Sequence, residues 1–378
     1  MKVVSVVGAR PNFMKVAPFC RALKAYHDIK HILVHTGQHY DVRMSEQFFK
    51  ELDIPNPDIN LEIGSGTHAE QVGRTMIAFE KVLKEEKPDW VVVLGDVNAT
   101  CACSITAKKE HIKCAHIEAG LRSYDMDMPE EINRLVTDRL SDLLFTPDRL
   151  SNANLKAEGV PDEKVKFVGN IMIDTLEREH EKAAALDINV IAKENLIDEL
   201  AVRELPALAE RGYVAMTMHR PSNVDQAETL VPAMRFFLDE VSKEYPIVWA
   251  IHPRAQKMLK TFGLWDEVVA NSNMILVKPL GYHAMLRLNM GARLFMTDSG
   301  GLQEECCVLG TPCLTMRWNT ERPITLMKNG GASILVGNAV SKMREAYRSQ
   351  IDAERHAMRP ELWDGRTAER IAQILVAR

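Results

Sequence analysis

The chain has 378 residues, a length that suits two domains better than one compact core. Hydrophobic residues make up 46% and charged residues 26%, an ordinary balance for a globular protein. A formal net charge of -5 leaves no basic excess for nucleic-acid binding, and no run of about 18 apolar residues predicts a membrane span. We therefore expect a globular protein that binds neither nucleic acid nor a membrane.

The N-terminal sequence MKVVSVVGARP predicts a first β-strand and not a signal peptide, because its short apolar run leads directly into a turn. The chain contains seven cysteines, and none of them has the paired spacing of a zinc site. We interpret them as buried free thiols, which fits a reducing cytoplasm.

Short runs rich in Val, Ile and Leu alternate with longer helical patterns, which is typical of βαβ units and parallel sheets. The expected strands cover residues 3–7, 31–36, 90–95, 114–120, 165–170, 213–219, 247–252, 274–279, 293–298 and 312–316. The pattern weakens into a polar helical stretch at residues 177–205, which places a domain boundary near residues 172–205. We predict an α/β protein with two doubly wound Rossmann-like domains facing a cleft.

Several familiar motifs are missing from the sequence. No G-x-G-x-x-G follows a strand, and there is neither a Walker-type phosphate loop nor an HExxH motif. A dinucleotide-binding fingerprint is therefore excluded.

Polar residues that directly follow predicted strands are the candidates for chemistry, because ligands of α/β sheets bind at the carboxyl ends of strands. Arg10 lies between a glycine and a proline, so we favour anion binding over a solvated surface position. Asp96 suits catalysis and helix capping equally well. Burial of Glu118 costs free energy unless the residue is paired with a cation or catalytic, and desolvation there would raise its pKa.

Four other candidates have structural alternatives. Glu130 and Glu131 follow Pro129 at an expected helix start, so each of them could simply complement the helix dipole. His219, taken alone, is better interpreted as a core histidine, and His252 is a weaker candidate still.

The segment MTDSGGLQEECCVLGTP, residues 296–312, places Ser299, Gly300 and Gly301 where a helix begins. The unpaired N–H groups of a helix N-terminus favour phosphate, and the glycines allow close approach to the backbone. Glu304 or Glu305 could accept hydrogen bonds from a ribose. A nucleotide-diphosphate cradle is one interpretation, and a glycine-rich turn with helix-capping acids is the other.

Taken in order, a series of motifs resembles the non-hydrolysing UDP-N-acetylglucosamine 2-epimerases: VVGARPNFMKVAP, HTGQH, VVLGD, HIEAGLRS, MPEEINR, TMHRPSN, TDSGGLQEE and TERPITL. The resemblance extends from the first strand to LWDGRTAERI near the end. It implies the two-domain architecture of GT-B glycosyltransferases, in which the last helix packs on the first domain. The implied domains are residues 1–173 completed by residues 361–378, and residues 174–360.

The resemblance also implies the site residues. The catalytic set would be Asp96, Glu118, Glu131 and His219. The substrate- and UDP-binding set would be Arg10, Lys15, Arg134, His252, Leu280, Met285, Ser299, Gly300, Gly301, Glu305 and Arg322.

The chain departs from the family pattern in two regions. Leu280 and Met285 stand where several bacterial members carry glutamine and phenylalanine in the nucleoside-binding loop. Gln38 and His39 match part of an allosteric substrate site, but the later GSGTHAEQ does not match, which speaks against substrate activation.

The expected reaction is epimerisation at C2 of UDP-N-acetylglucosamine, through loss of UDP to a 2-acetamidoglucal and its re-addition. Cationic residues, carboxylates and a closed cleft meet its needs. We expect no cofactor and no metal, UDP-N-acetylglucosamine and UDP as ligands, a homodimer, and a cytoplasmic location. The alternatives are a hydrolysing epimerase, an epimerase of a UDP-diacetamido-uronic acid, and a catalytically silent UDP-sugar sensor.

Overall fold

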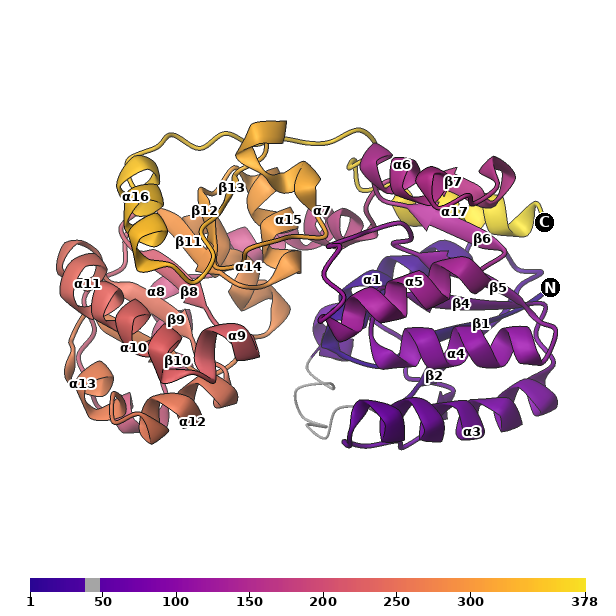
Figure 1. The fold of residues 1–378 in the computed structure, drawn as a ribbon, viewed down its shortest axis with the longest axis horizontal. Coiled ribbons are helices and arrows are strands. Elements are labelled where there is room, and N and C mark those ends of the chain that lie inside the picture. Colours follow the sequence, from indigo (N-terminus) through magenta and orange to yellow (C-terminus); the bar gives the residue numbers. More distant parts are fainter. Residues whose placement is uncertain (38–47) are drawn as a thin grey trace. The chain divides into compact units, whose positions relative to one another are not determined.

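The computed structural model describes residues 1–37 and 48–378, which form two compact units (Figure 1). Unit 1 comprises Met1–Arg178 and Pro360–Arg378, and unit 2 comprises Glu179–Arg359. The sequence placed these boundaries after residues 173 and 360.

Unit 1 contains a seven-stranded parallel sheet with the order β3-β2-β1-β4-β5-β6-β7. The strands are β1 (Lys2–Val7), β2 (Lys30–His35), β3 (Ile59–Asn60), β4 (Trp90–Leu94), β5 (Lys113–Ile117), β6 (Leu143–Thr146) and β7 (Val165–Phe167). The order reverses between β1 and β4. In a doubly wound sheet such a reversal marks the ligand-binding edge.

The helices of unit 1 cover the sheet, with α3, α4 and α5 packed side by side and α1 packed against α17 (Figure 1). Their bounds are α1 (Arg10–Leu23), α3 (His68–Glu86), α4 (Asn98–Lys109), α5 (Pro129–Leu140), α6 (Arg149–Ala157), η1 (Asp162–Lys164), α7 (Ile171–Ala184) and α17 (Thr367–Val376). The boundary between the units falls within α7.

Unit 2 contains a six-stranded parallel sheet with the order β10-β9-β8-β11-β12-β13, which reverses between β8 and β11. Its strands are β8 (Val214–Thr217), β9 (Ile247–Ala250), β10 (Met274–Val277), β11 (Leu294–Thr297), β12 (Cys313–Thr315) and β13 (Ser333–Leu335). Its helices are α8 (Ile188–Glu194), η2 (Asp198–Leu200), α9 (Pro221–Val224), α10 (Ala227–Phe236), η3 (Phe237–Val241), α11 (Ser242–Glu244), α12 (Pro253–Thr261), α13 (Trp265–Ala270), α14 (Tyr282–Gly291), α15 (Gly300–Leu309), η4 (Pro323–Thr325), η5 (Met327–Asn329) and α16 (Val340–Gln350).

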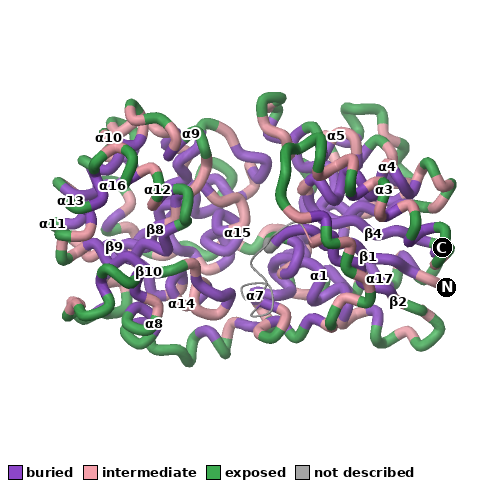
Figure 2. Tube along the Cα trace, turned by 90° about the horizontal axis from the view of Figure 1, so that it is seen from below, coloured by how far each residue is buried: buried purple, intermediate pink, exposed green. Residues whose placement is uncertain are grey.

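The central strands of both sheets are buried, as Figure 2 shows by colour, whereas β3, β7 and β13 are partly exposed. Helices on both faces exclude water from them, which explains their nearly continuous apolar sequences. Every expected strand is present, so the predicted α/β class is confirmed. All seven cysteines are free and buried, also as predicted. Within the described part of the chain, no helix is long and apolar enough to cross a membrane.

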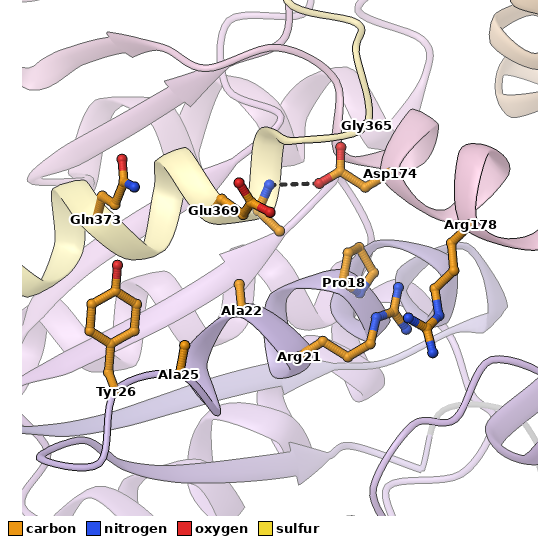
Figure 3. Close-up of a pocket in the computed structure, with 11 residues that line it drawn as sticks. Pro18, Arg21, Ala22, Ala25, Tyr26, Asp174, Arg178, Gly365, Glu369 and Gln373 are labelled. Carbon is orange, nitrogen blue, oxygen red and sulfur yellow. Dashed lines mark hydrogen bonds between the residues drawn. The ribbon is translucent and has the colours of Figure 1, made fainter.

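The C-terminal helix α17 is held at its start by a side chain from α7. Both oxygens of the Asp174 carboxylate accept backbone N–H groups, from Thr367 at 3.0 Å and from Ala368 at 2.7 Å. Burial raises the pKa of Asp174 to about 6, against the opposing effect of these hydrogen bonds. Asp174 also lines a pocket of about 530 Å³ between α1 and α17 (Figure 3), and none of the predicted site residues lines it.

Candidate active site

The predicted residues of unit 1 gather at the carboxyl edge of its sheet. Asp96 follows β4, Glu118 follows β5, and Arg10 is the first residue of α1, which follows β1. Glu131 and Arg134 come from the first turns of α5. Gln38 and His39 lie outside the described residues.

Glu118 is paired with Lys15. The two charged groups form an ion pair, and their side chains are only 2% and 5% exposed. Glu118 itself has a left-handed backbone, with φ of 72°. Gly95 lies against the pair, since a Cβ on it would stand 2.9 Å from Lys15 Nζ. Burial of the glutamate is therefore offset by a buried cation.

Glu131 is held by hydrogen-bond donors on several sides. Its carboxylate accepts bonds from the Ser123 N–H at 3.0 Å, the Ser123 hydroxyl at 2.9 Å, and the Tyr124 N–H at 2.9 Å. Burial opposes ionisation here, but these bonds and Arg134 outweigh it and lower the pKa of Glu131. Glu131 is therefore a carboxylate near neutral pH.

Arg134 connects two of the predicted carboxylates. Its guanidinium is buried, donates to Glu131 through Nε at 2.9 Å, and also forms an ion pair with Asp96. Asp96 is 23% exposed and does not cap α4, whose N-cap is Val97. The capping alternative for Asp96 is therefore wrong.

In unit 2, His219 follows β8 and Asp298 follows β11. His219 Nδ1 lies 2.7 Å from Asp298 Oδ1, and the backbone N–H groups of His219 and Arg220 each donate to Oδ2 at 2.8 Å. Burial would raise the pKa of Asp298, but His219 and the backbone donors lower it to about 2. The His219 side chain is 42% exposed, so the core-histidine alternative is wrong.

His252 lies beside His219, with their ring centroids 5.7 Å apart. Its Nδ1 accepts the Arg254 N–H at 3.1 Å and so caps α12. The structure thus gives His252 a capping role and places it next to a predicted catalytic residue.

Ser299 is the N-cap of α15, so the predicted helix start at Gly300 is correct. A Cβ on Gly300 would lie 2.6 Å from both Arg322 Nη1 and Glu321 Oε1. Arg322 is paired with Glu321 and lies 2.7 Å, through its Nε, from Glu304 Oε1. The glycine pair and the predicted arginine are therefore neighbours at one helix end.

The remaining predicted residues lie deeper in unit 2. Leu280 is 1% exposed, and Met285 packs against the same core at the start of α14. Glu305 is buried, and together with burial it raises the pKa of Tyr282.

Asp298 and Glu321 are two residues of the site that were not predicted from the sequence. Asp298 carries the same signal that picked out Asp96, namely an acid directly after a buried strand. Glu321 has no such signal, because its role depends on Arg317 and Arg322 being close by. Among the residues that the structure describes, no three His, Cys, Asp or Glu side chains are grouped so that they could hold a metal ion.

A family model described as UDP-N-acetylglucosamine 2-epimerase matches residues 21–376. The chain belongs to this family. It is 42% identical over 376 residues to the UDP-N-acetylglucosamine 2-epimerase of Methanocaldococcus jannaschii, covering 99% of each chain. It is 37% identical over 353 residues to the UDP-2,3-diacetamido-2,3-dideoxy-D-glucuronate 2-epimerase of Pseudomonas aeruginosa, covering 93% of this chain and 92% of the relative.

Solved structures agree with this assignment. The M. jannaschii epimerase in complex with UDP-GlcNAc and UDP has a TM-score of 0.89 at 40% identity, with 100% of both chains covered. A glycosyltransferase of kitacinnamycin, at 12% identity and a TM-score of 0.56, covers 100% of this chain and 98% of its own, and it shows the fold alone. The predicted epimerase family and GT-B-type fold are confirmed.

Proposed function

We propose that this protein interconverts UDP-N-acetylglucosamine and UDP-N-acetylmannosamine at C2. The observation that carries the proposal is the cluster of Asp96, Arg134 and Glu131 beside the Lys15–Glu118 pair, at the switch point of the first sheet. The family relationship gives this cluster its substrate class.

The reaction must overcome the weak acidity of the C2 proton, which is not next to a carbonyl. Breaking the C1–O bond sends its electron pair to UDP, while the C2 proton passes to a carboxylate and a C1=C2 double bond forms. Return of a proton to the opposite face of C2, with re-addition of UDP at C1, gives the epimer. The steps balance without an oxidant or a reductant, and the proposal includes no cofactor and no metal.

The two sides of the proton transfer are assigned to Asp96 and Glu118. Glu131 is less suited to accept a proton, because its carboxylate already accepts four hydrogen bonds, which lower its pKa. Its role in the proposal is to hold Arg134, whose cation also faces Asp96. Because the reaction is reversible, the carboxylate that removes the proton in one direction returns it in the other.

The diphosphate is assigned to unit 2. Ser299, Gly300 and Gly301 present the N–H groups of the first turn of α15, which attract phosphate. Arg322 adds a cation beside Gly300, and His219 adds an exposed imidazole. In this assignment Glu305 accepts hydrogen bonds from the ribose.

A second candidate is the C2 epimerisation of a UDP-diacetamido-uronic acid. The Pseudomonas relative, 37% identical, is named for that activity and favours it. The two candidates share the chemistry at C2 and differ in the groups on the sugar. A panel of both sugar nucleotides, compared by kcat/KM, separates them.

The test is to incubate the purified protein with UDP-N-acetylglucosamine alone in D2O and to analyse the product by NMR. We expect UDP-N-acetylmannosamine that carries deuterium at C2. Product without deuterium would exclude transfer through an exchangeable carboxyl group. Free N-acetylmannosamine would indicate a hydrolysing enzyme, and binding without turnover would indicate a sensor.

The proposal includes a homodimer in a cytoplasmic location. The seven buried free thiols support a reducing compartment. Light scattering on the purified protein measures the oligomeric state, and a mass of one chain, 42.6 kDa, contradicts the dimer.

A further inference from the structure

His116 of β5 is fully buried and has no role in the chemistry proposed above. Its ring makes two short hydrogen bonds. Nδ1 lies 2.6 Å from Asp138 Oδ1, and Nε2 lies 2.7 Å from the carbonyl oxygen of Gly95. Both ring nitrogens are therefore engaged, on opposite sides of the imidazole.

Asp138, on α5, is the centre of a buried polar network. Its Oδ2 accepts the backbone N–H of Gly120 at 3.0 Å and Arg122 Nη1 at 2.7 Å. Arg122 also forms a two-bond pair with Glu158, at 2.7 Å for each bond. Burial alone would raise the pKa of Asp138, but His116 and Arg122 outweigh it and lower the pKa.

The partners of His116 define the protonation of its ring. The Gly95 carbonyl can only accept a hydrogen bond, so Nε2 must carry a proton. On the other side of the ring, Nδ1 faces the Asp138 carboxylate. The network thus joins His116 and Arg122 to Asp138 and Glu158.

The atoms that this network holds belong to the two turns that carry Asp96 and Glu118. Gly95 directly precedes Asp96, and Gly120 is two residues after Glu118. The three residues Gly95, Glu118 and Gly120 all have left-handed backbones, with φ of 65°, 72° and 82°. The two glycines adopt this backbone without strain, but a non-glycine residue such as Glu118 keeps it only where surrounding contacts fix it.

A shift of Gly95 would reach both carboxylates. A Cβ at Gly95 would stand 3.4 Å from Glu118 Oε2 and 2.9 Å from Lys15 Nζ, so the backbone here is packed against the ion pair. On its other side Gly95 is covalently joined to Asp96. The position of the Gly95 carbonyl, to which His116 is bonded, therefore affects both the Asp96 and the Glu118 carboxylate.

We propose that the His116–Asp138 pair is a positioning device that fixes the spacing of the Asp96 and Glu118 turns. The inference rests on the proposed function, in which those two carboxylates exchange the C2 proton. His116 acts through the backbone and does not touch the sugar. A misplacement of about 1 Å is enough to slow such chemistry strongly, because reacting groups must be in near-attack geometry.

A matched pair of variants separates the two bonds of the ring. In His116→Gln the amide nitrogen stands near the position of Nε2, so the bond to Gly95 is kept and the bond to Asp138 is lost. In His116→Asn the amide nitrogen stands near Nδ1, so only the bond to Asp138 is kept. We expect kcat to fall roughly tenfold to a hundredfold in His116→Asn, with partial recovery in His116→Gln.

A purely structural histidine would behave differently. It predicts equal losses of stability in the two variants, measured by thermal unfolding, with kcat unchanged in the protein that remains folded. Our proposal predicts a fall in kcat with KM changed less than about threefold, since the UDP-binding residues of unit 2 are untouched. The control is His111→Asn, at an exposed position two residues before the start of β5, and it should keep full activity.

Nitrogen-15 NMR of the histidine-labelled protein gives a second readout that needs no turnover. We expect the His116 ring to carry a proton on Nε2, which donates to the Gly95 carbonyl oxygen. A ring without a proton on Nε2, or a His116→Asn variant with wild-type kcat, would overturn the proposal. If the wild type does not act on UDP-N-acetylglucosamine, the proposed function fails, and the variants are compared on the diacetamido-uronic acid nucleotide.

Discussion

At the scale of single residues, Glu131 and Arg134 show how a buried cation organises carboxylates. Arg134 contacts both Glu131 and Asp96, so removing the charge of Glu131 leaves the guanidinium without half of its compensation. We expect Glu131→Gln to lower kcat at least about a hundredfold, as for loss of a group that supports proton transfer. Steady-state kinetics with UDP-N-acetylglucosamine measure it.

The matched control is Glu130→Gln, one residue earlier in the same helical turn. Glu130 is only partly buried, so its variant should keep activity within about twofold. Equal losses in the two variants would mean that the helix end needs negative charge in general and that Glu131 has no special part.

The second prediction at the scale of single residues concerns Asp298. Its carboxylate holds His219 and the backbone behind it, and it remains ionised far below neutral pH. We expect Asp298→Asn to weaken UDP binding roughly tenfold, about 1.4 kcal/mol, because His219 loses its anionic partner. Isothermal titration with UDP measures the change.

The half-buried Asp225, which pairs with Arg254 at 2.6 Å, provides a comparison in the same unit. Asp225→Asn should bind UDP as the wild type does. An unchanged affinity in Asp298→Asn would separate His219 from the diphosphate and contradict the assignment of that residue.

At the scale of elements, the helix α15 begins at a glycine, Gly300, and the missing side chain leaves room for a ligand at this helix end. A methyl group at Gly300 would meet the ends of Arg322 and Glu321, which are flexible, so the helix should still form while that pair moves. We expect Gly300→Ala to reduce UDP affinity about tenfold or more with little loss of stability. Titration with UDP and thermal unfolding test the two parts.

Gly73 in the middle of α3 is the control, because a Cβ there meets nothing within 4 Å. Gly73→Ala should raise the free energy of unfolding by roughly 0.5–1 kcal/mol through helix propensity and leave UDP binding unchanged. Wild-type UDP affinity in Gly300→Ala would show that the ligand does not approach this helix end.

Sequence patterns predicted most of the strands but not all of them. The ten apolar runs became strands because a buried parallel strand needs an apolar side chain on both faces. The strands β3, β6 and β13 were missed because two to four residues give only a weak pattern, although β7 and β12, of three residues each, were found.

The candidate site was likewise predicted only in part. Asp96, Glu118 and His219 follow strands, and this order along the chain is visible in the sequence. The Lys15–Glu118 pair and the His116–Asp138 bond join residues that are far apart in the chain. Such pairs are created by packing, so the sequence revealed the individual groups but not which of them neutralise each other.

At the scale of the whole molecule, the C-terminal segment completes unit 1 through Asp174. The folded state raises the pKa of this carboxyl from 3.8 to about 6, so it binds a proton more tightly than the unfolded state does. Stability contributed by this group therefore increases as the pH falls from about 7 through 6 toward 4, by at most about 3 kcal/mol.

Asp174→Asn isolates this contribution from carboxylates whose lowered pKa acts in the opposite direction, such as Glu131 and Asp298. The free energy of unfolding of the wild type minus that of the variant should grow as the pH falls from 7.5 to about 4.5. Chemical denaturation at several pH values measures it. A difference that is constant or shrinks would contradict the raised pKa.

The division of the chain has a practical consequence for making its parts. Unit 2 is one uninterrupted segment, Glu179–Arg359, whereas unit 1 is assembled from both sides of it. Unit 2 can therefore be cloned as a single fragment, with one cut inside α7, while unit 1 requires a new linker between Arg178 and Pro360. In the language of protein engineering, the second unit is an insertion and the first is its host.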